Sequence, residues 1–185
     1  MDANKKKRFM YARRLARELA LQFLFQLDIQ KPDNLQEALE EFWEQVGLYF
    51  FFADGKRRFD VYDDVLKSFL NSTIKFELDK EIIDDFPTLS EMKGVKEYVE
   101  NIVRGVLDNQ DDIDKVITSC ADNWRLDRMS TVDRNLIRLA TYEIKYLDDI
   151  PVPVSIDEAI EISKDYSDVK SSNFINGILD KIKDI

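Results

Sequence analysis

The sequence has no histidine and a single cysteine, Cys120, among its 185 residues. A catalytic Cys-His pair and an ordinary zinc site both need side chains that this chain lacks. A lone cysteine also cannot form an internal disulfide, which is typical of proteins in the reducing cytoplasm. We therefore predict a cytoplasmic protein with no metal site and no cofactor.

Long apolar runs are also missing, and none approaches the length of a membrane span. Arg13, Arg14 and Arg17 interrupt the segment in which a secretory signal would need its apolar stretch. The sequence has no glycine-rich phosphate loop and no alternation of strand and helix patterns. We expect no membrane partner and no doubly wound nucleotide-binding fold.

Paired acidic residues are the candidates for catalysis that these absences leave. They are Asp63-Asp64, Asp111-Asp112 and Asp148-Asp149. We interpret them as helix caps or solvated loops, because no constellation of other reactive groups accompanies them. The sequence therefore predicts that the protein is not an enzyme.

Helical periodicity is the dominant pattern. Apolar residues recur at steps of three and four in six stretches, which are 8–28, 35–46, 95–106, 113–124, 132–140 and 174–182. Ser130 or Thr131 is a suitable N-cap for the helix that follows. The fold class predicted from this pattern is all-α.

Two short motifs refine the helix boundaries near the C-terminus. The stretch "SIDE", residues 155–158, has the form of a capping box and predicts a helix start at Ser155. Asn176-Gly177 alone would favour a hairpin turn, but the helical period continues through it. We interpret Gly177 as a helical residue whose missing side chain lets another helix approach closely.

Charge is distributed unevenly along the chain. Residues 1–17 carry seven Lys and Arg against one acid, a net charge of +6, whereas the whole chain has a net charge of −10. Arginines near the predicted helix start at residue 8 are unfavourable, since a helix N-terminus is itself positive. An anionic partner would offset this cost, with nucleic acid the first choice and an acidic membrane surface the second.

Four stretches together resemble the bacterial NusB family of transcription antitermination factors. They are "ARRLARELALQFLFQLD", "NWRLDRMSTVDRNLIRLATYEI", "DIPVPVSIDEAIEISKDYS" and "SSNFINGILDKI". The resemblance covers residues 12–47 and 94–183. It implies one all-α domain over 1–185, a helical bundle of two packed three-helix subdomains with a basic N-terminal arm at 1–11.

The resemblance also implies a function. Members of the family bind the boxA element of nascent ribosomal RNA transcripts together with NusE, a small-subunit ribosomal protein, within the RNA polymerase antitermination complex. NusB-like domains also occur fused to ribosomal RNA methyltransferases, but this sequence shows no accompanying cofactor-binding domain. A competing hypothesis is a helical protein-protein adaptor whose basic arm docks an acidic partner without specific RNA binding.

The predicted RNA contacts come from matched family positions. Arg13, Arg14 and Arg17 match the family's arginine-rich helix start, and Tyr166 and Phe174 match aromatic positions near its RNA surface. Phe174 also begins an apolar helical stripe, which favours core packing. Further predicted contacts are Lys170, which stands where family members carry an acid, and four auxiliary cations of the arm, Lys5, Lys6, Lys7 and Arg8.

A second apolar line on the first helix, Leu21 and Phe25, suggests another partner surface. The family's NusE-binding surface includes the positions of Phe25 and Asp133. Packing against the other helical subdomain is an equal alternative for the apolar line, and Asp133 alternatively serves as a favourable first-turn acid.

Residues 48–92 are where the resemblance fails. This segment is an insertion rich in aromatic residues, with a helical pattern over 61–69 and a strand-like alternation over 74–78. So much apolar content argues against a disordered linker. We expect the insertion to pack on the body or to form a partner surface, self-association as a homodimer included.

Overall fold

The computed structural model of the protein describes residues 3–49, 52–53, 56–57, 89–121, 125–168 and 170–185. The chain forms two compact units, Ile29–Leu78 and the combination of Met1–Asp28 with Asp79–Ile185. Apart from one pair of two-residue strands, the regular elements of the described residues are helices. The predicted all-α fold class is confirmed.

Helix α1 spans Ala3–Gln30 and begins five residues before the predicted start. Arg13 therefore lies about three turns into the helix, where the positive end of the helix dipole no longer acts. The expectation that Arg13, Arg14 and Arg17 oppose the dipole is wrong. The cations of the arm occupy the first turns instead, and the first turn holds no acidic residue.

The unit Ile29–Leu78 contains helix α2, Leu35–Tyr49. Asn34 caps the N-terminus of α2, because its Oδ1 accepts a hydrogen bond from the Gln36 N–H at 3.0 Å. Strands β1, Phe52–Ala53, and β2, Lys56–Arg57, form an antiparallel pair in the same unit. The predicted helix over 61–69 and strand over 74–78 lie outside the described residues.

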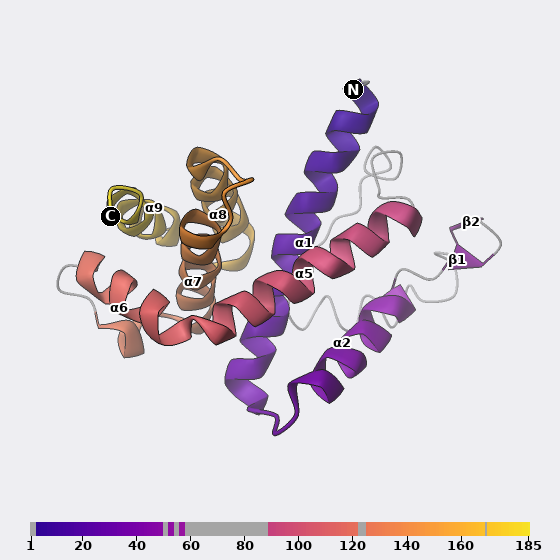
Figure 1. The fold of residues 1–185 in the computed structure, drawn as a ribbon, viewed down its shortest axis with the longest axis horizontal. Coiled ribbons are helices and arrows are strands. Elements are labelled where there is room, and N and C mark those ends of the chain that lie inside the picture. The colour runs from indigo at the N-terminus through magenta and orange to yellow at the C-terminus, as the bar shows by residue number, and fades with distance from the viewer. Residues whose placement is uncertain (1–2, 50–51, 54–55, 58–88, 122–124, 169) are drawn as a thin grey trace. The chain divides into compact units, whose positions relative to one another are not determined.

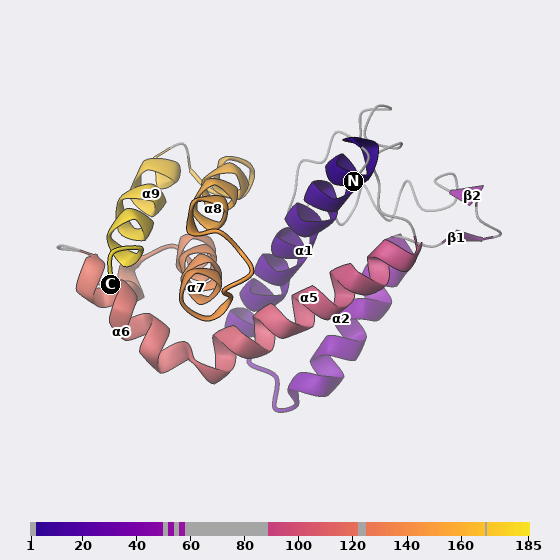
Figure 2. The ribbon, with the colours of Figure 1, turned by 45° about the horizontal axis from the view of Figure 1, so that its top comes forward.

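Five helices follow in the other unit, of which α7 is the central one. It contacts α5, α6, α8 and α9, and Figures 1 and 2 show α8 and α9 beside it. Their bounds are Leu89–Asp108 for α5, Gln110–Cys120 for α6, Thr131–Tyr146 for α7, Val152–Tyr166 for α8 and Ser171–Ile182 for α9, with a 3-10 turn η1 at Leu126–Arg128. Apolar residues of α6, α7, α8 and α9, together with Leu21 of α1, form one buried core.

The two predicted helix starts in this unit have different outcomes. Ser130 caps α7 as predicted, and its Oγ accepts from the Asp133 N–H at 3.0 Å. The predicted start at Ser155 is wrong, because α8 begins at Val152 after Pro151. Pro153 fits the first turn of that helix, where no N–H partner is required. The Ser155 side chain is buried and makes a tertiary hydrogen bond instead.

Close helix approach occurs at Gly105 rather than at Gly177. Gly177 lies within α9 as predicted, but a Cβ there would meet no atom within 4 Å, so the expected close approach of another helix at Gly177 is wrong. A Cβ at Gly105 would overlap the ring of Tyr142, which comes from α7. The missing side chain of Gly105 thus makes room for an aromatic ring between α5 and α7.

This placement predicts opposite effects of alanine at the two glycines. Gly177→Ala should stabilise the fold by about 0.5 to 1 kcal/mol, because alanine favours a helix. Gly105→Ala should not stabilise the fold, since the ring of Tyr142 must move to make room for the added methyl group. In a Tyr142→Ala background, Gly105→Ala should become stabilising. Urea unfolding of the single and double variants measures this, and an equal gain at both glycines in the wild-type background would contradict it.

Candidate nucleic-acid interface

The carboxylate of Glu143 lies at the centre of a buried polar cluster and is itself fully buried. It accepts hydrogen bonds from Arg17 Nε at 2.8 Å and Nη2 at 3.2 Å. The Tyr98 hydroxyl donates to it at 2.6 Å and the Ser155 hydroxyl at 2.7 Å. These donors come from α1, α5 and α8, so one side chain of α7 ties four helices together.

Arg17 is therefore held inside the protein, with 3% of its surface exposed. A second carboxylate, that of Glu158, lies 3.6 Å from its Nη1. Burial, the largest single influence, lowers the pKa of Arg17, but the attraction and hydrogen bond of Glu143 together with the attraction of Tyr98 and Glu158 outweigh it, and the pKa is raised. The guanidinium of Arg17 is thus paired and covered in this structure, and its contact with RNA stays a prediction.

Arg13 and Arg14 reach the surface of α1. Arg14 pairs with Glu158 of α8 through Nε at 3.0 Å and Nη2 at 2.8 Å, and 41% of its side chain is exposed. The side-chain hydrogen bond to Glu158 raises the pKa of Arg14. Arg13 lies over the ring of Tyr98, its Cζ 4.1 Å from the ring centroid. Both guanidinium groups are thus oriented by neighbouring helices.

Tyr166 lies at the C-terminal end of α8 and contacts α1. Its hydroxyl donates to Glu18 Oε2 at 3.4 Å and accepts from Gln22 Nε2 at 3.3 Å. Glu18 is 8% exposed, and burial raises its pKa to about 7 despite the opposing attraction of Arg14. Burial also raises the pKa of Tyr166. The structure brings Tyr166 and the Arg14 turn of α1 to neighbouring positions.

Lys170 is exposed and occupies the N-cap position of α9. Serines on both sides of Lys170 donate hydrogen bonds to Asp133. Its carboxylate accepts from Ser167 Oγ at 2.6 Å and from Ser171 Oγ at 3.0 Å. Asp133 is only 8% exposed. Its carboxylate is buried and hydrogen-bonded to these two hydroxyls in this structure, and its contact with NusE stays a prediction.

The remaining predicted site residues are divided between core and surface. Leu21 is 2% exposed and belongs to the apolar core, so its predicted place on a partner surface is wrong. Phe25 is half-buried. Phe174 is partly buried and packs against the core, as the apolar stripe indicated. Lys6 and Lys7 are exposed, whereas the side chains of Lys5 and Arg8 lie outside the described residues.

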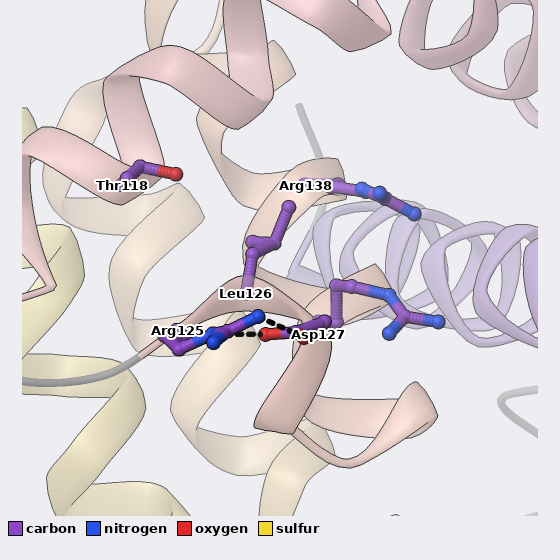
Figure 3. Close-up of a pocket in the computed structure, with 6 residues that line it drawn as sticks. Thr118, Arg125, Leu126, Asp127 and Arg138 are labelled. Carbon is purple, nitrogen blue, oxygen red and sulfur yellow. Dashed lines mark hydrogen bonds and ion pairs between the residues drawn. The ribbon is translucent and has the colours of Figure 1, made fainter.

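A pocket of about 440 Å³ is lined by residues of α6, η1 and α7, among them three arginines. Figure 3 shows one of them, Arg125, joined to Asp127. The other two, Arg134 and Arg138, form ion pairs with Asp28 and Asp114 at 2.9 Å and 2.7 Å. Each of the three arginines of this pocket is thus paired with an aspartate.

Comparison with known proteins decides the family. The model of the NusB family matches residues 60–184. The chain belongs to the NusB family. A transcription antitermination protein NusB from Clostridium botulinum is 38% identical over 171 residues, which are 92% of this chain and 98% of that protein. The NusB family match includes residues 60–92, so only the part of the predicted insertion before residue 60 lies outside it.

Solved NusB structures share the fold. NusB from T. maritima superposes with a TM-score of 0.63 at 32% identity, over 93% of this chain and 90% of that one. A structure of the antitermination factors NusB and NusE in complex with dsRNA gives a TM-score of 0.63 at 21% identity, over 95% of this chain and 98% of that chain. At that identity the second NusB structure supports the fold alone.

In the described part of this NusB-family chain, none of the helices combines the length and apolar character that crossing a membrane requires. The same residues hold no group of three or more side chains suited to binding a metal ion.

The buried Glu18 predicts a pH-dependent stability. Because its pKa in the folded protein is raised to about 7, folding favours the protonated acid. Its contribution should be largest below the unfolded pKa of about 4.5 and decline as the pH rises to 7. Glu18→Gln, which stays neutral, should gain stability relative to wild type across this window. Thermal melts from pH 4.5 to 8 measure the difference, and a constant difference would contradict the prediction.

Proposed function

We propose that the protein is a transcription antitermination factor that binds boxA-type single-stranded RNA of nascent ribosomal RNA transcripts together with a NusE-type ribosomal protein. The observation that carries this proposal is the pair Arg13 and Arg14, which reach the surface of α1 in a chain whose net charge is −10. Residues 1–17, which include the start of α1, carry a net charge of +6 in this acidic chain, and such a local excess attracts an anionic ligand to that end of the helix.

Arg14 suits phosphate recognition even though it is paired. A guanidinium has five N–H donors, and the bond to Glu158 uses two of them. The remaining donors can bind a phosphate oxygen while Glu158 holds the group in place. Tyr166 adds an aromatic side chain beside this turn, and RNA readers combine such rings with cations to bind unpaired bases.

Lys170 extends the proposed cationic surface beyond α1. It follows the connection that Asp133 anchors, so its backbone is fixed while its side chain is exposed. Its neighbour Phe174 packs on the core. We assign the charge contact to Lys170 and a supporting role to Phe174.

The proposed protein partner rests on a related structure that contains NusB, NusE and double-stranded RNA. Phe25 is the candidate contact, because it is the one of the three predicted NusE residues that the structure does not bury. Arginines of α1 already bind carboxylates within this molecule. This pairing favours the adaptor as a second candidate, in which the arm docks an acidic protein.

Replacing Arg13 and Arg14 by alanine tests the proposal. The double variant should bind boxA RNA at least tenfold more weakly, and each lost phosphate contact should reduce the log-log salt slope by roughly 0.7. Arg125→Ala is the matched control, since Arg125 is exposed and pairs with Asp127 of η1 rather than with a residue of α1. Fluorescence anisotropy with boxA RNA, a scrambled RNA and a duplex across a salt series measures the affinities.

Binding by the double variant that equals wild type, with an unchanged slope, would contradict the placement on α1. Equal affinity of wild type for boxA and scrambled RNA would favour generic charge attraction and strengthen the adaptor hypothesis. The same titration with NusE adds an arm for Phe25. Phe25→Asp should abolish any strengthening by NusE while RNA binding alone is retained, because a charge in an apolar interface must be desolvated.

A further inference from the structure

The ring of Phe9 is exposed on the basic part of α1. Its side chain is 51% exposed, although phenylalanine is a residue that folding normally buries. In both views of the fold the N-terminal turns of α1 lead away from α7 and α9 (Figures 1 and 2). Within the described part of the chain, Phe9 is therefore an exposed aromatic ring outside the core.

Cations flank Phe9 along one face of the helix. Lys6 precedes it by three residues and Arg13 follows it by four, and both spacings place side chains next to each other. The Cζ of Arg13 lies 5.3 Å from the Phe9 ring centroid and 4.1 Å from that of Tyr98. Arg13 thus joins the two rings, and its contact with Tyr98 fixes it to α5.

The other exposed large apolar side chains do not share this setting. Met10 is 59% exposed on the adjoining face of α1 but has no aromatic ring. Ile29, Val154 and Ile185 are also exposed, and none of them has an aromatic ring. Tyr146 is 43% exposed, but its ring stacks on that of Tyr142 with the ring centroids 5.4 Å apart. Phe9 therefore combines an exposed aromatic ring with cations at both helical neighbours.

We propose that Phe9 is a stacking platform for a nucleobase of the bound RNA. Proteins that bind unpaired RNA place bases on aromatic side chains while nearby cations hold the phosphates. Residues 1–17, which include Phe9, carry a net charge of +6, and this charge complements RNA rather than an apolar protein pocket. This inference rests on the proposed RNA-binding function and adds a base contact to it.

Three substitutions at Phe9 separate stacking from apolar contact. Phe9→Ala removes the ring, Phe9→Leu keeps apolar bulk without an aromatic face, and Phe9→Trp keeps the face. Stacking on one base is expected to be worth about tenfold in affinity, so the alanine and leucine variants should bind boxA RNA about tenfold more weakly. Phe9→Trp should bind at least as tightly as wild type. The salt slope should stay unchanged in all three, because no phosphate contact is lost.

Met10→Ala is the matched control, because it removes a neighbouring exposed apolar side chain and should leave affinity unchanged. A second readout uses RNA with 2-aminopurine at successive positions. One position should change its fluorescence on binding wild type and should not do so with Phe9→Ala. Circular dichroism checks that α1 stays helical in each variant.

Wild-type affinity in Phe9→Ala or Phe9→Leu would overturn the stacking role and leave the proposed function standing. An equal loss in Met10→Ala would also overturn it, since the effect would then be generic to the arm. If wild type binds neither boxA nor scrambled RNA, the proposed function and this inference fall together. If the Phe9 variants bind RNA as tightly as wild type and with the same salt dependence, the stacking role is refuted and the proposed function is not.

Discussion

The buried ion pair between Glu143 and Arg17 is the interaction on which the rest of the structure depends. An isolated charge at that depth would be strongly unfavourable, but donors from three other helices satisfy it. Arg17 provides the opposite charge, and Tyr98 and Ser155 complete the hydrogen bonds. A single acidic residue of α7 thereby fixes α1, α5 and α8 relative to one another.

This cluster also determines what the surface of α1 presents. Arg17 faces inward to Glu143, so the neighbouring arginines must leave the helix in other directions. Arg14 meets Glu158 on α8, and Arg13 lies over Tyr98, whose hydroxyl is held by Glu143. Side chains that are oriented before binding lose less conformational freedom when a ligand arrives. The contacts with Glu158 and Tyr98 thus orient the side chains of Arg14 and Arg13 before a ligand binds.

Helical periodicity was sufficient to predict the fold class, and it located α7 and its Ser130 cap, because these depend on neighbours in sequence. Periodicity does not reveal which residues of other helices a side chain contacts. Glu143 lies 126 residues from Arg17, and nothing local to "ARRLAR" distinguishes a buried arginine from exposed ones. Ser155 fits a capping box, yet the helix starts at Val152 and the hydroxyl binds Glu143. Leu21 likewise belongs to the core, since sequence spacing does not reveal which helix covers a face.

The most direct test of this account is a double-mutant cycle between Arg17 and Glu143. Arg17→Met and Glu143→Met should each lower the free energy of unfolding by about 3 to 5 kcal/mol. The first leaves Glu143 buried without an opposite charge, and the second leaves Arg17 buried with only the more distant Glu158 carboxylate, at 3.6 Å. The double variant should lose less than either single one. The exposed pair Lys96 and Glu100 is the control, with a coupling energy near zero. Additive losses at Arg17 and Glu143, measured by urea unfolding, would contradict the central role of the cluster.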